Sequence, residues 1–387
     1  AVRSTEGSPV SHHPALDALH RQYNLSPVIN AAGSYTPLGV SRSSEHVAQS
    51  AAVALQSFFV MNELQALASE RLAAFCGCEA AAVTHCVSAA ITQAVAACIA
   101  GSDPVAVADL PDAKGRANAV VIPEGHCVNY GHPLVTDIRL AGATVVRAGT
   151  RDACSLGDIE KALDEPGACG LLLVSSRLTA FQDVDTQGAV AAARHRGIPV
   201  IIDGAAQDMR MPDLLATGAD AVLISAHKYL ASPTAGLVLG TRAFVERFRA
   251  QALGIGRGMK PSKEAIVGVL AALEERQAQD PVAWRQQQDQ KVAMAVALLG
   301  ACPDIQTFIE PDPVGMPFQR VRVSFLQGVG AARQVVQALK AGRPSIWVME
   351  HQLDQGVIVL ELVALSEQEV GQVIDAINSA LAALTPR

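Results

Sequence analysis

Residues 218–240 read GADAVLISAHKYLASPTAGLVLG and place a lysine between two apolar strands. The runs 221–225 and 236–240 are short, apolar and bounded by turn residues, which is typical of buried strands. Lys228 follows His227 at the mouth of the loop between them. A buried ammonium is costly unless it is paired, deprotonated or covalently bonded, so we expect a chemical reason for this lysine.

The sequence before this stretch alternates between strand and helix patterns. Strands are expected at 80–84, 119–122, 144–147, 170–175 and 199–202, with helices at 89–100, 133–141, 156–163, 186–195 and 212–217. Such alternation predicts an α/β fold with a mostly parallel sheet that helices cover on both faces. Ligands of such sheets bind beyond the carboxyl ends of the strands.

The pattern changes after residue 243. Long helices are expected at 263–279, 283–299 and 367–384, together with short strands in RVRVSF, SIWVME and GVIVLE. We therefore predict an N-terminal arm and helix over 1–45, a large domain over 46–255 and a smaller α+β domain over 256–387. A chain of 387 residues is long enough for two cores.

The composition argues against several classes of partner. The net charge is −7 and no Lys/Arg run stands out, so we expect no nucleic-acid partner. No uninterrupted apolar stretch is long enough for a membrane span, and the first residues lack the apolar core of a secretory signal.

The eight cysteines contain only one close pair, Cys76 and Cys78, whose C-x-C spacing fits neither a redox motif nor a zinc ribbon. We expect buried free thiols, no metal site and a cytoplasmic protein.

An aspartate and the lysine occupy the ends of consecutive strands. Asp203 closes the strand at 199–202, and Lys228 follows the strand at 221–225. This pair suits pyridoxal phosphate (PLP): the carboxylate pairs with the protonated ring nitrogen, and the lysine forms the resting Schiff base and later moves the Cα proton. Ala205 is small enough for the flat ring, and Gln207 in DGAAQ joins the predicted cofactor-binding residues. An ordinary Asp–Lys ion pair is the alternative.

The cofactor phosphate needs donors, and the ring needs a flat neighbour. Ser88, Ala89 and Ala90 open the helix after the strand at 80–84, where free amides favour an anion, and Ser225 adds a hydroxyl. A plain N-cap or strand-end hydroxyl would explain the two serines equally. His126, which follows the strand at 119–122, is our candidate for stacking on the ring, in preference to His85 and His132.

These motifs resemble the fold-type I PLP enzymes, and more narrowly the selenocysteine synthase-like group that includes D-glucosaminate-6-phosphate ammonia-lyase. The similarity rests on INAAGSYTPLG, VIPEGHCVNYGHPLVTDIRLAGATVV, IPVIIDGAAQ, the lysine stretch and GRGMKPSKEAIVGVLAALE. It implies a homodimer or larger homo-oligomer in which GRGMKPSK lies near a cofactor. A basic hinge is the alternative reading of that loop.

The sequence departs from the group at two places. His227 stands where small residues are common, as it does in PLP decarboxylases, and THCVS replaces a Ser-Gly-rich start of the phosphate helix. The imidazole of His227 could stack, bind the phosphate or shuttle a proton, so we count it with Lys228, Asp203 and His126 as a catalytic candidate.

The reaction subtype is left open by these residues. We predict a lyase of the carbon–nitrogen or carbon–oxygen class that eliminates a β-substituent from a small amino acid or amino-sugar acid and releases ammonia. A racemase, a retro-aldolase and a non-catalytic PLP-binding regulator are alternatives; a Rossmann-type nucleotide enzyme lacks its G-x-G-x-x-G. Candidates for gripping the substrate carboxylate are Arg320, Arg322 and Arg343.

Overall fold

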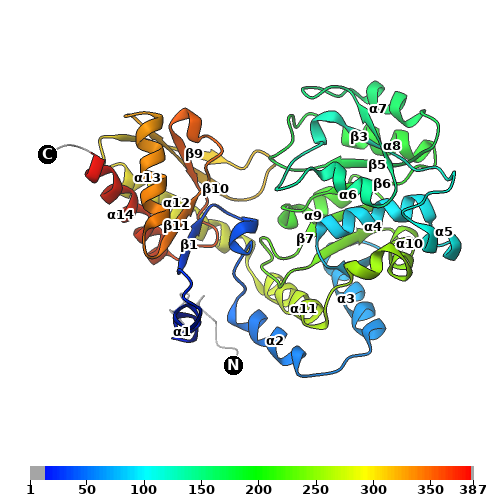
Figure 1. The fold of residues 1–387 in the computed structure, drawn as a ribbon, viewed down its shortest axis with the longest axis horizontal. Coiled ribbons are helices and arrows are strands. Elements are labelled where there is room, and N and C mark those ends of the chain that lie inside the picture. Colours follow the sequence, from blue (N-terminus) through cyan, green and yellow to red (C-terminus); the bar gives the residue numbers. More distant parts are fainter. Residues whose placement is uncertain (1–13, 385–387) are drawn as a thin grey trace. The chain divides into compact units, whose positions relative to one another are not determined.

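The computed structural model describes residues 14–384, and it divides into two compact units (Figure 1). The larger unit is continuous and covers Ser43–Gln279. The discontinuous unit joins the described residues up to Arg42 with those from Asp280 onward. Residues 256–279 thus pack with the larger unit, whereas the sequence placed them at the start of the small domain.

A seven-stranded sheet forms the centre of the larger unit. Its order is β2-β8-β7-β6-β5-β3-β4, and β8 alone runs antiparallel to its neighbours. The strands are β2 (Ala80–Thr84), β3 (Ala119–Pro123), β4 (Thr144–Ala148), β5 (Ala168–Val174), β6 (Val200–Asp203), β7 (Ala221–Ser225) and β8 (Gly236–Gly240). The predicted α/β class is confirmed.

Side chains alternate between two cores, one on each face of this sheet. Along β7, Val222 and Ile224 join one core while Ala221 and Leu223 join the other, as the period of a strand requires. The first core contains α2 (Glu45–Leu55), α3 (Met61–Cys76), α7 (Leu156–Leu163), α8 (Thr186–His195), α9 (Met211–Leu215) and α11 (Lys263–Ala278). The second contains α4 (Val87–Ala100), α5 (Pro104–Asp109), α6 (Leu134–Leu140) and α10 (Arg242–Ala250).

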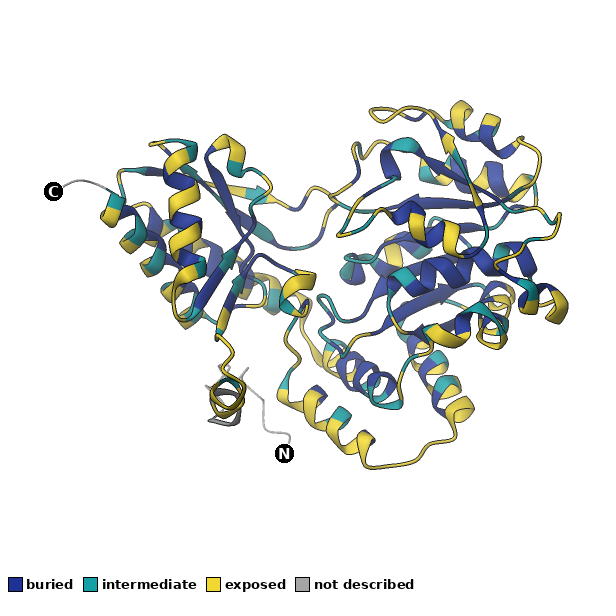
Figure 2. Ribbon diagram, viewed as in Figure 1, coloured by how far each residue is buried: buried dark blue, intermediate teal, exposed yellow. Residues whose placement is uncertain are grey.

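The discontinuous unit has two small sheets and its own apolar core. Strands β12 (Val357–Leu360), β10 (Gln319–Phe325) and β9 (Ile305–Pro311) are antiparallel, while β1 (Val28–Ala31) pairs in parallel with β11 (Ser345–Val348). Its helices are α1 (Pro14–Tyr23), α12 (Pro281–Leu299), α13 (Val329–Ala341) and α14 (Glu367–Leu384). Figure 2 shows the buried strands of each unit in dark blue.

Lys291 is a buried cation that holds a loop of the discontinuous unit. Its Nζ donates to the carbonyls of Leu362, Val363 and Leu365 at 2.9, 3.1 and 3.0 Å. Burial lowers the pKa of this ammonium to about 8. The lysine therefore ties α12 to the segment that follows β12.

We expect Lys291→Met to destabilise the protein by about 2–3 kcal/mol, because three buried carbonyls lose a charged donor. Urea unfolding followed by circular dichroism at pH 7 measures the loss. Lys340→Met is the control, since Lys340 pairs with Glu350 at a partly exposed site and such pairs contribute about 0–1 kcal/mol. Equal stability of the two variants would contradict the role given to Lys291.

Candidate functional site

Asp203 and Lys228 lie at the same edge of the large sheet. Strands β6 and β7 are parallel neighbours, and Asp203 is paired in register with Leu223. Lys228 comes three residues after β7, in a turn where its amide donates to the carbonyl of Ser225 at 3.2 Å. The charge of Lys228 acts on the Asp203 carboxyl, so the predicted pair is brought together.

The carboxyl group of Asp203 is buried and has an unusual acidity. Burial raises its pKa to about 6. The hydrogen bond from the amide of Ala205 and the charge of Lys228 act in the opposite direction and lower the pKa. Oδ1 accepts the hydrogen bond from the Ala205 amide at 3.0 Å. A carboxylate in this environment gains from a cation placed against it. Ala205, two residues after Asp203, is half-buried, and its contact with a cofactor ring stays a prediction.

His227 holds the loop that carries the lysine. Its Nδ1 lies 3.2 Å from Ser225 Oγ and 3.1 Å from the carbonyl of Ala235. Burial lowers the pKa of the ring, and the neighbouring charge of Lys228 acts in the same direction. The neutral ring thus joins the end of β7 to the start of β8. The hydroxyl of Ser225, which we expected to face the phosphate, contacts this imidazole.

His126 lies buried after β3, at the same sheet edge. Its Nδ1 accepts a hydrogen bond from the Val174 amide at 2.9 Å, and Val174 pairs in register with Asp203. Burial lowers the pKa of the imidazole to about 4. The ring is therefore neutral near pH 7, and its centroid lies 5.6 Å from that of Phe181. A neutral flat ring beside the strand of Asp203 fits the predicted stacking role.

The helix expected to bind the phosphate begins earlier than predicted. Helix α4 starts at Val87, and the Ala90 amide already donates to the Cys86 carbonyl at 2.9 Å. Ala90 is therefore wrong as a free backbone donor, because it makes the first hydrogen bond of the helix. The amides of Val87 and Ser88 precede that bond, and the Ala89 amide reaches Cys86 Sγ at 3.5 Å.

A polar network beside Ser88 was not predicted. Ser88 Oγ lies 3.0 Å from the Tyr130 hydroxyl, which donates to Asp137, and Asp137 Oδ1 lies 3.0 Å from His132 Nε2. Burial raises the pKa of Tyr130, and its hydrogen bond to Asp137 raises it further, so the phenol keeps its proton. The negative charge of Asp137 also raises the pKa of Asp203. Apart from polar residues close to His126, no local pattern in the sequence points to this network.

The loop GRGMKPSK borders the same edge through its backbone. The carbonyl of Met259 accepts hydrogen bonds from the His85 amide at 3.1 Å and from Thr84 Oγ1 at 2.9 Å. Arg257 and Lys260 on either side of Met259 are exposed. The loop therefore lies where β2 ends and α4 begins.

The remaining candidates are Gln207 and the three arginines predicted to bind the substrate carboxylate. Gln207 is buried, its amide donates to the Gly204 carbonyl at 2.8 Å, and its side chain accepts from Arg210. Arg320, Arg322 and Arg343 belong to the discontinuous unit.

Two of these arginines have carboxylate partners of their own. Arg320 forms buried ion pairs with Asp312 at 2.8 Å and Glu361 at 2.7 Å. Arg322 lies 3.6 Å from Glu310, and Arg343 is exposed. The structure thus gives Arg320 a role within its unit, and its predicted grip on a substrate carboxylate gains no support.

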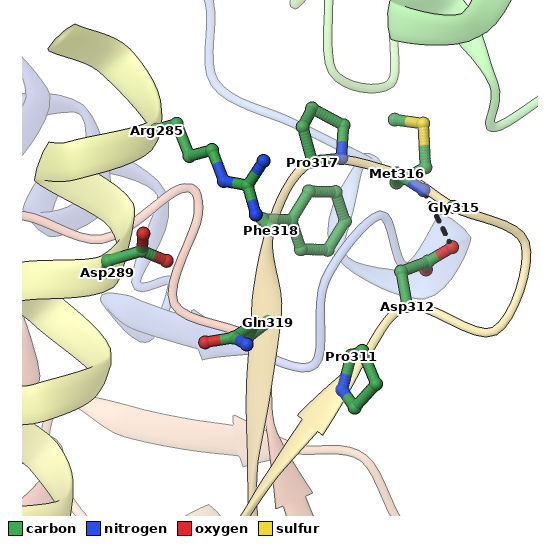
Figure 3. Close-up of a pocket in the computed structure, with 9 residues that line it drawn as sticks. All are labelled: Arg285, Asp289, Pro311, Asp312, Gly315, Met316, Pro317, Phe318 and Gln319. Atoms are coloured by element: carbon green, nitrogen blue, oxygen red, sulfur yellow. Dashed lines mark hydrogen bonds between the residues drawn. The ribbon is translucent and has the colours of Figure 1, made fainter. Parts of the chain in front are cut away.

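A cavity of about 280 Å³ lies in the discontinuous unit, between α12 and residues 311–319 (Figure 3). Figure 3 shows Arg285 directed toward Phe318 at its rim.

Among residues 14–384, no helix has the length and apolar character that a membrane crossing requires. Within the same range, no three His, Cys, Asp or Glu side chains gather as a metal ion would require.

Comparison with known proteins gives concordant results. The family model "SelA: L-seryl-tRNA selenium transferase" matches residues 28–280. The D-glucosaminate-6-phosphate ammonia lyase of Salmonella typhimurium is 35% identical over 362 residues, which cover 92% of this chain and 96% of that protein. A Streptomyces 5'-C-glycyluridine monooxygenase-decarboxylase is 30% identical over 352 residues, 90% of this chain and 88% of the other.

A solved structure of D-glucosaminate-6-phosphate ammonia-lyase superposes with a TM-score of 0.84 at 32% identity, over 94% of this chain and 98% of that one. The resemblance expected from the motifs and the fold-type I architecture are both confirmed. The chain belongs to the SelA family, and the ammonia lyase is its relative over most of its length.

Proposed function

We propose that this chain is a PLP-dependent ammonia-lyase that converts a phosphorylated amino-sugar acid into a 2-oxo acid and ammonia. The observation that carries the proposal is the buried carboxyl of Asp203 beside the lysine of the next strand. The similarity to an ammonia lyase across 92% of the chain selects the reaction from among those that such a pair serves.

The residues at the sheet edge fit PLP. Burial raises the pKa of the Asp203 carboxyl, and a protonated ring nitrogen placed against it would stabilise its ionised form. Lys228 would hold the aldehyde carbon, neutral His126 would face the ring, and the first amides of α4 would hold the phosphate. Bound PLP supplies an electron sink that makes the bonds at an amino acid's α-carbon labile.

The protein's own groups then orient the substrate and move its protons. Lys228 Nζ takes the proton from the α-carbon and returns it to the β-hydroxyl, which leaves as water. The β-carbon of the resulting enamine takes up a proton to give an imine. A water molecule then replaces the imine nitrogen, which leaves as ammonia, and the product is a 2-oxo acid. Asp203 would keep the ring nitrogen of bound PLP protonated, and neutral His227 holds the lysine loop in place.

Arg257 and Lys260 are the candidates for the substrate's own phosphate. Both are exposed on the loop that Met259 fixes to the end of β2, beside the start of α4. The relative's substrate carries a 6-phosphate by its name. A pair of cations at this position would attract such a group.

The homodimer or larger assembly expected from the sequence stays a prediction, which light scattering tests.

A screen of D- and L-amino acids, with D-glucosaminate and its 6-phosphate included, tests this function. We expect a 2-oxo acid and ammonia in equal amounts, with the phosphorylated acid preferred. Exchange of the α-hydrogen in heavy water without a 2-oxo acid would show a racemase instead, and release of an aldehyde would show an aldolase. A protein that binds PLP but changes no amino acid in the screen would contradict the lyase and favour the regulator.

A further inference from the structure

Arg276, in the last turn of α11, contacts both loops that carry the predicted catalytic residues. Its Nη2 donates to Asp208 Oδ2 at 2.8 Å and to the carbonyl of Tyr229 at 3.0 Å. Asp208 lies five residues after Asp203, and Tyr229 directly follows Lys228. One guanidinium nitrogen therefore joins the segment after β6 to the turn after β7.

The contact is shielded from water. The side chain of Asp208 is completely buried and that of Arg276 is 14% exposed. A charge-assisted hydrogen bond in such surroundings is short and strong, and a second acceptor on the same nitrogen fixes the direction of the guanidinium. The two loops thus keep a defined separation as long as Arg276 is in place.

Helix α11 also fixes the lysine loop at a second point. A Cβ built on Gly268 would lie 2.4 Å from the Cδ and Cγ atoms of Pro233, so only glycine allows this close approach. Between the two contacts with α11, Ser43 Oγ donates to the carbonyl of Ala231 at 2.7 Å. The backbone around Lys228 is held at three places, which concentrates its freedom in the lysine side chain.

We propose that Arg276 is a positioning residue that sets Lys228 and Asp203 relative to each other. The inference rests on the proposed function, since the two groups need a fixed separation only if they act on one bound cofactor. A displacement of about 1 Å of a catalytic group costs about 100-fold in rate, so loss of this contact should lower kcat far more than it raises KM.

Three variants test the role with PLP-loaded protein: Arg276→Met, Arg276→Lys and the double variant Arg276→Met/Asp208→Asn. Readouts are the denaturation temperature, the pH at which the visible band of bound PLP changes, and kcat and KM. Glu275→Gln is the matched control, because Glu275 neighbours Arg276 on α11 but contacts Ser44 instead of the two loops.

Arg276→Met should move the midpoint of the spectral titration by about one pH unit and lower kcat by about 100-fold. Arg276→Lys should recover part of both effects. The double variant no longer leaves the buried charge of Asp208 unpaired, so it should regain thermal stability. Its titration midpoint and its kcat should stay altered, because the carbonyl of Tyr229 still lacks the hydrogen bond from Arg276. Glu275→Gln should match the wild type.

The double variant could regain the wild-type midpoint of the spectral titration and the wild-type kcat together with its stability. That result would overturn the proposal, since Arg276 would then only neutralise Asp208. A wild-type titration midpoint in Arg276→Met would overturn it as well. Failure of the proposed function looks different: the wild-type protein itself would then give no visible band from PLP bound at Lys228.

Discussion

Lys228→Ala is expected to abolish covalent attachment of PLP and to lower turnover by about 10⁴-fold or more, because the variant loses both the anchor and the group that moves the α-proton. Borohydride treatment of wild-type protein incubated with PLP should fix the chromophore to the peptide that contains Lys228. Peptide mass spectrometry locates the adduct, and a product assay measures the turnover.

Lys161→Ala is the control for this experiment, since Lys161 lies exposed on α7 of the same unit. It should keep the adduct and the activity. An adduct on any other lysine, or turnover by the Lys228→Ala variant near the wild-type rate, would refute the assignment. Absence of a chromophore in the wild-type protein would refute the cofactor itself.

Asp203→Asn is expected to lower turnover by about 100-fold or more while the protein still folds. An amide cannot keep the ring nitrogen protonated, and a charge-assisted hydrogen bond of about 1.5–3 kcal/mol is also lost. Single-turnover spectra and steady-state rates measure the effect. Rates close to those of the wild type would show that the carboxylate does not act on the ring.

The same variant should be more stable than the wild type when both lack cofactor. The pKa of Asp203 in the folded protein is raised from 3.8 to about 6, so the ionised carboxylate weighs against the fold. This penalty is absent below pH 3.8, grows as the pH rises through the folded pKa, and reaches roughly 3 kcal/mol above pH 6. Asp203→Asn should therefore unfold at a higher temperature at pH 7.5, and the difference should shrink at pH 4.5.

Asp312→Asn is expected to change the stability of the protein in the opposite direction. Asp312 is also buried, but Arg320 pairs with it at 2.8 Å and the amides of Val314 and Met316 donate to it. Its loss should lower the denaturation temperature at pH 7.5, because Arg320 loses one of its carboxylates. If both aspartate variants shift stability in the same direction at that pH, the environment assigned to Asp203 is wrong.

Local patterns predicted the large sheet well because each of its strands is a short apolar run between turn residues. The runs at 80–84 and 221–225 match β2 and β7 in full. Strand β9 was missed because most of its residues are exposed and it ends in a proline, so it lacks the apolar pattern of a buried strand. Helix α5, which is six residues long, was missed as well.

The candidate site was predicted where its residues follow strands, and missed where it depends on side-chain direction. Asp203, Lys228 and His126 could be found because parallel strands end at one edge. Tyr130 and Asp137 come from a loop and a helix whose approach to Ser88 has no local sequence signal. Arg276 lies 48 residues after Lys228, counted along the sequence, and only the packing of α11 brings it near Tyr229.

The strand pairing also has a consequence for synthesis on the ribosome. Strand β2 leaves the ribosome early, yet its only partner in the large sheet, β8, is made about 150 residues later, and β1 must await β11 near residue 345. Until then both strands expose unpaired edges, which attract other chains. Pairing across such distances is slow, so nascent or truncated chains that end before residue 236 should be held by chaperones or aggregate. Because α4 follows β2 directly, the helix start that we propose as the phosphate site is fixed in place only after the lysine loop has been synthesised.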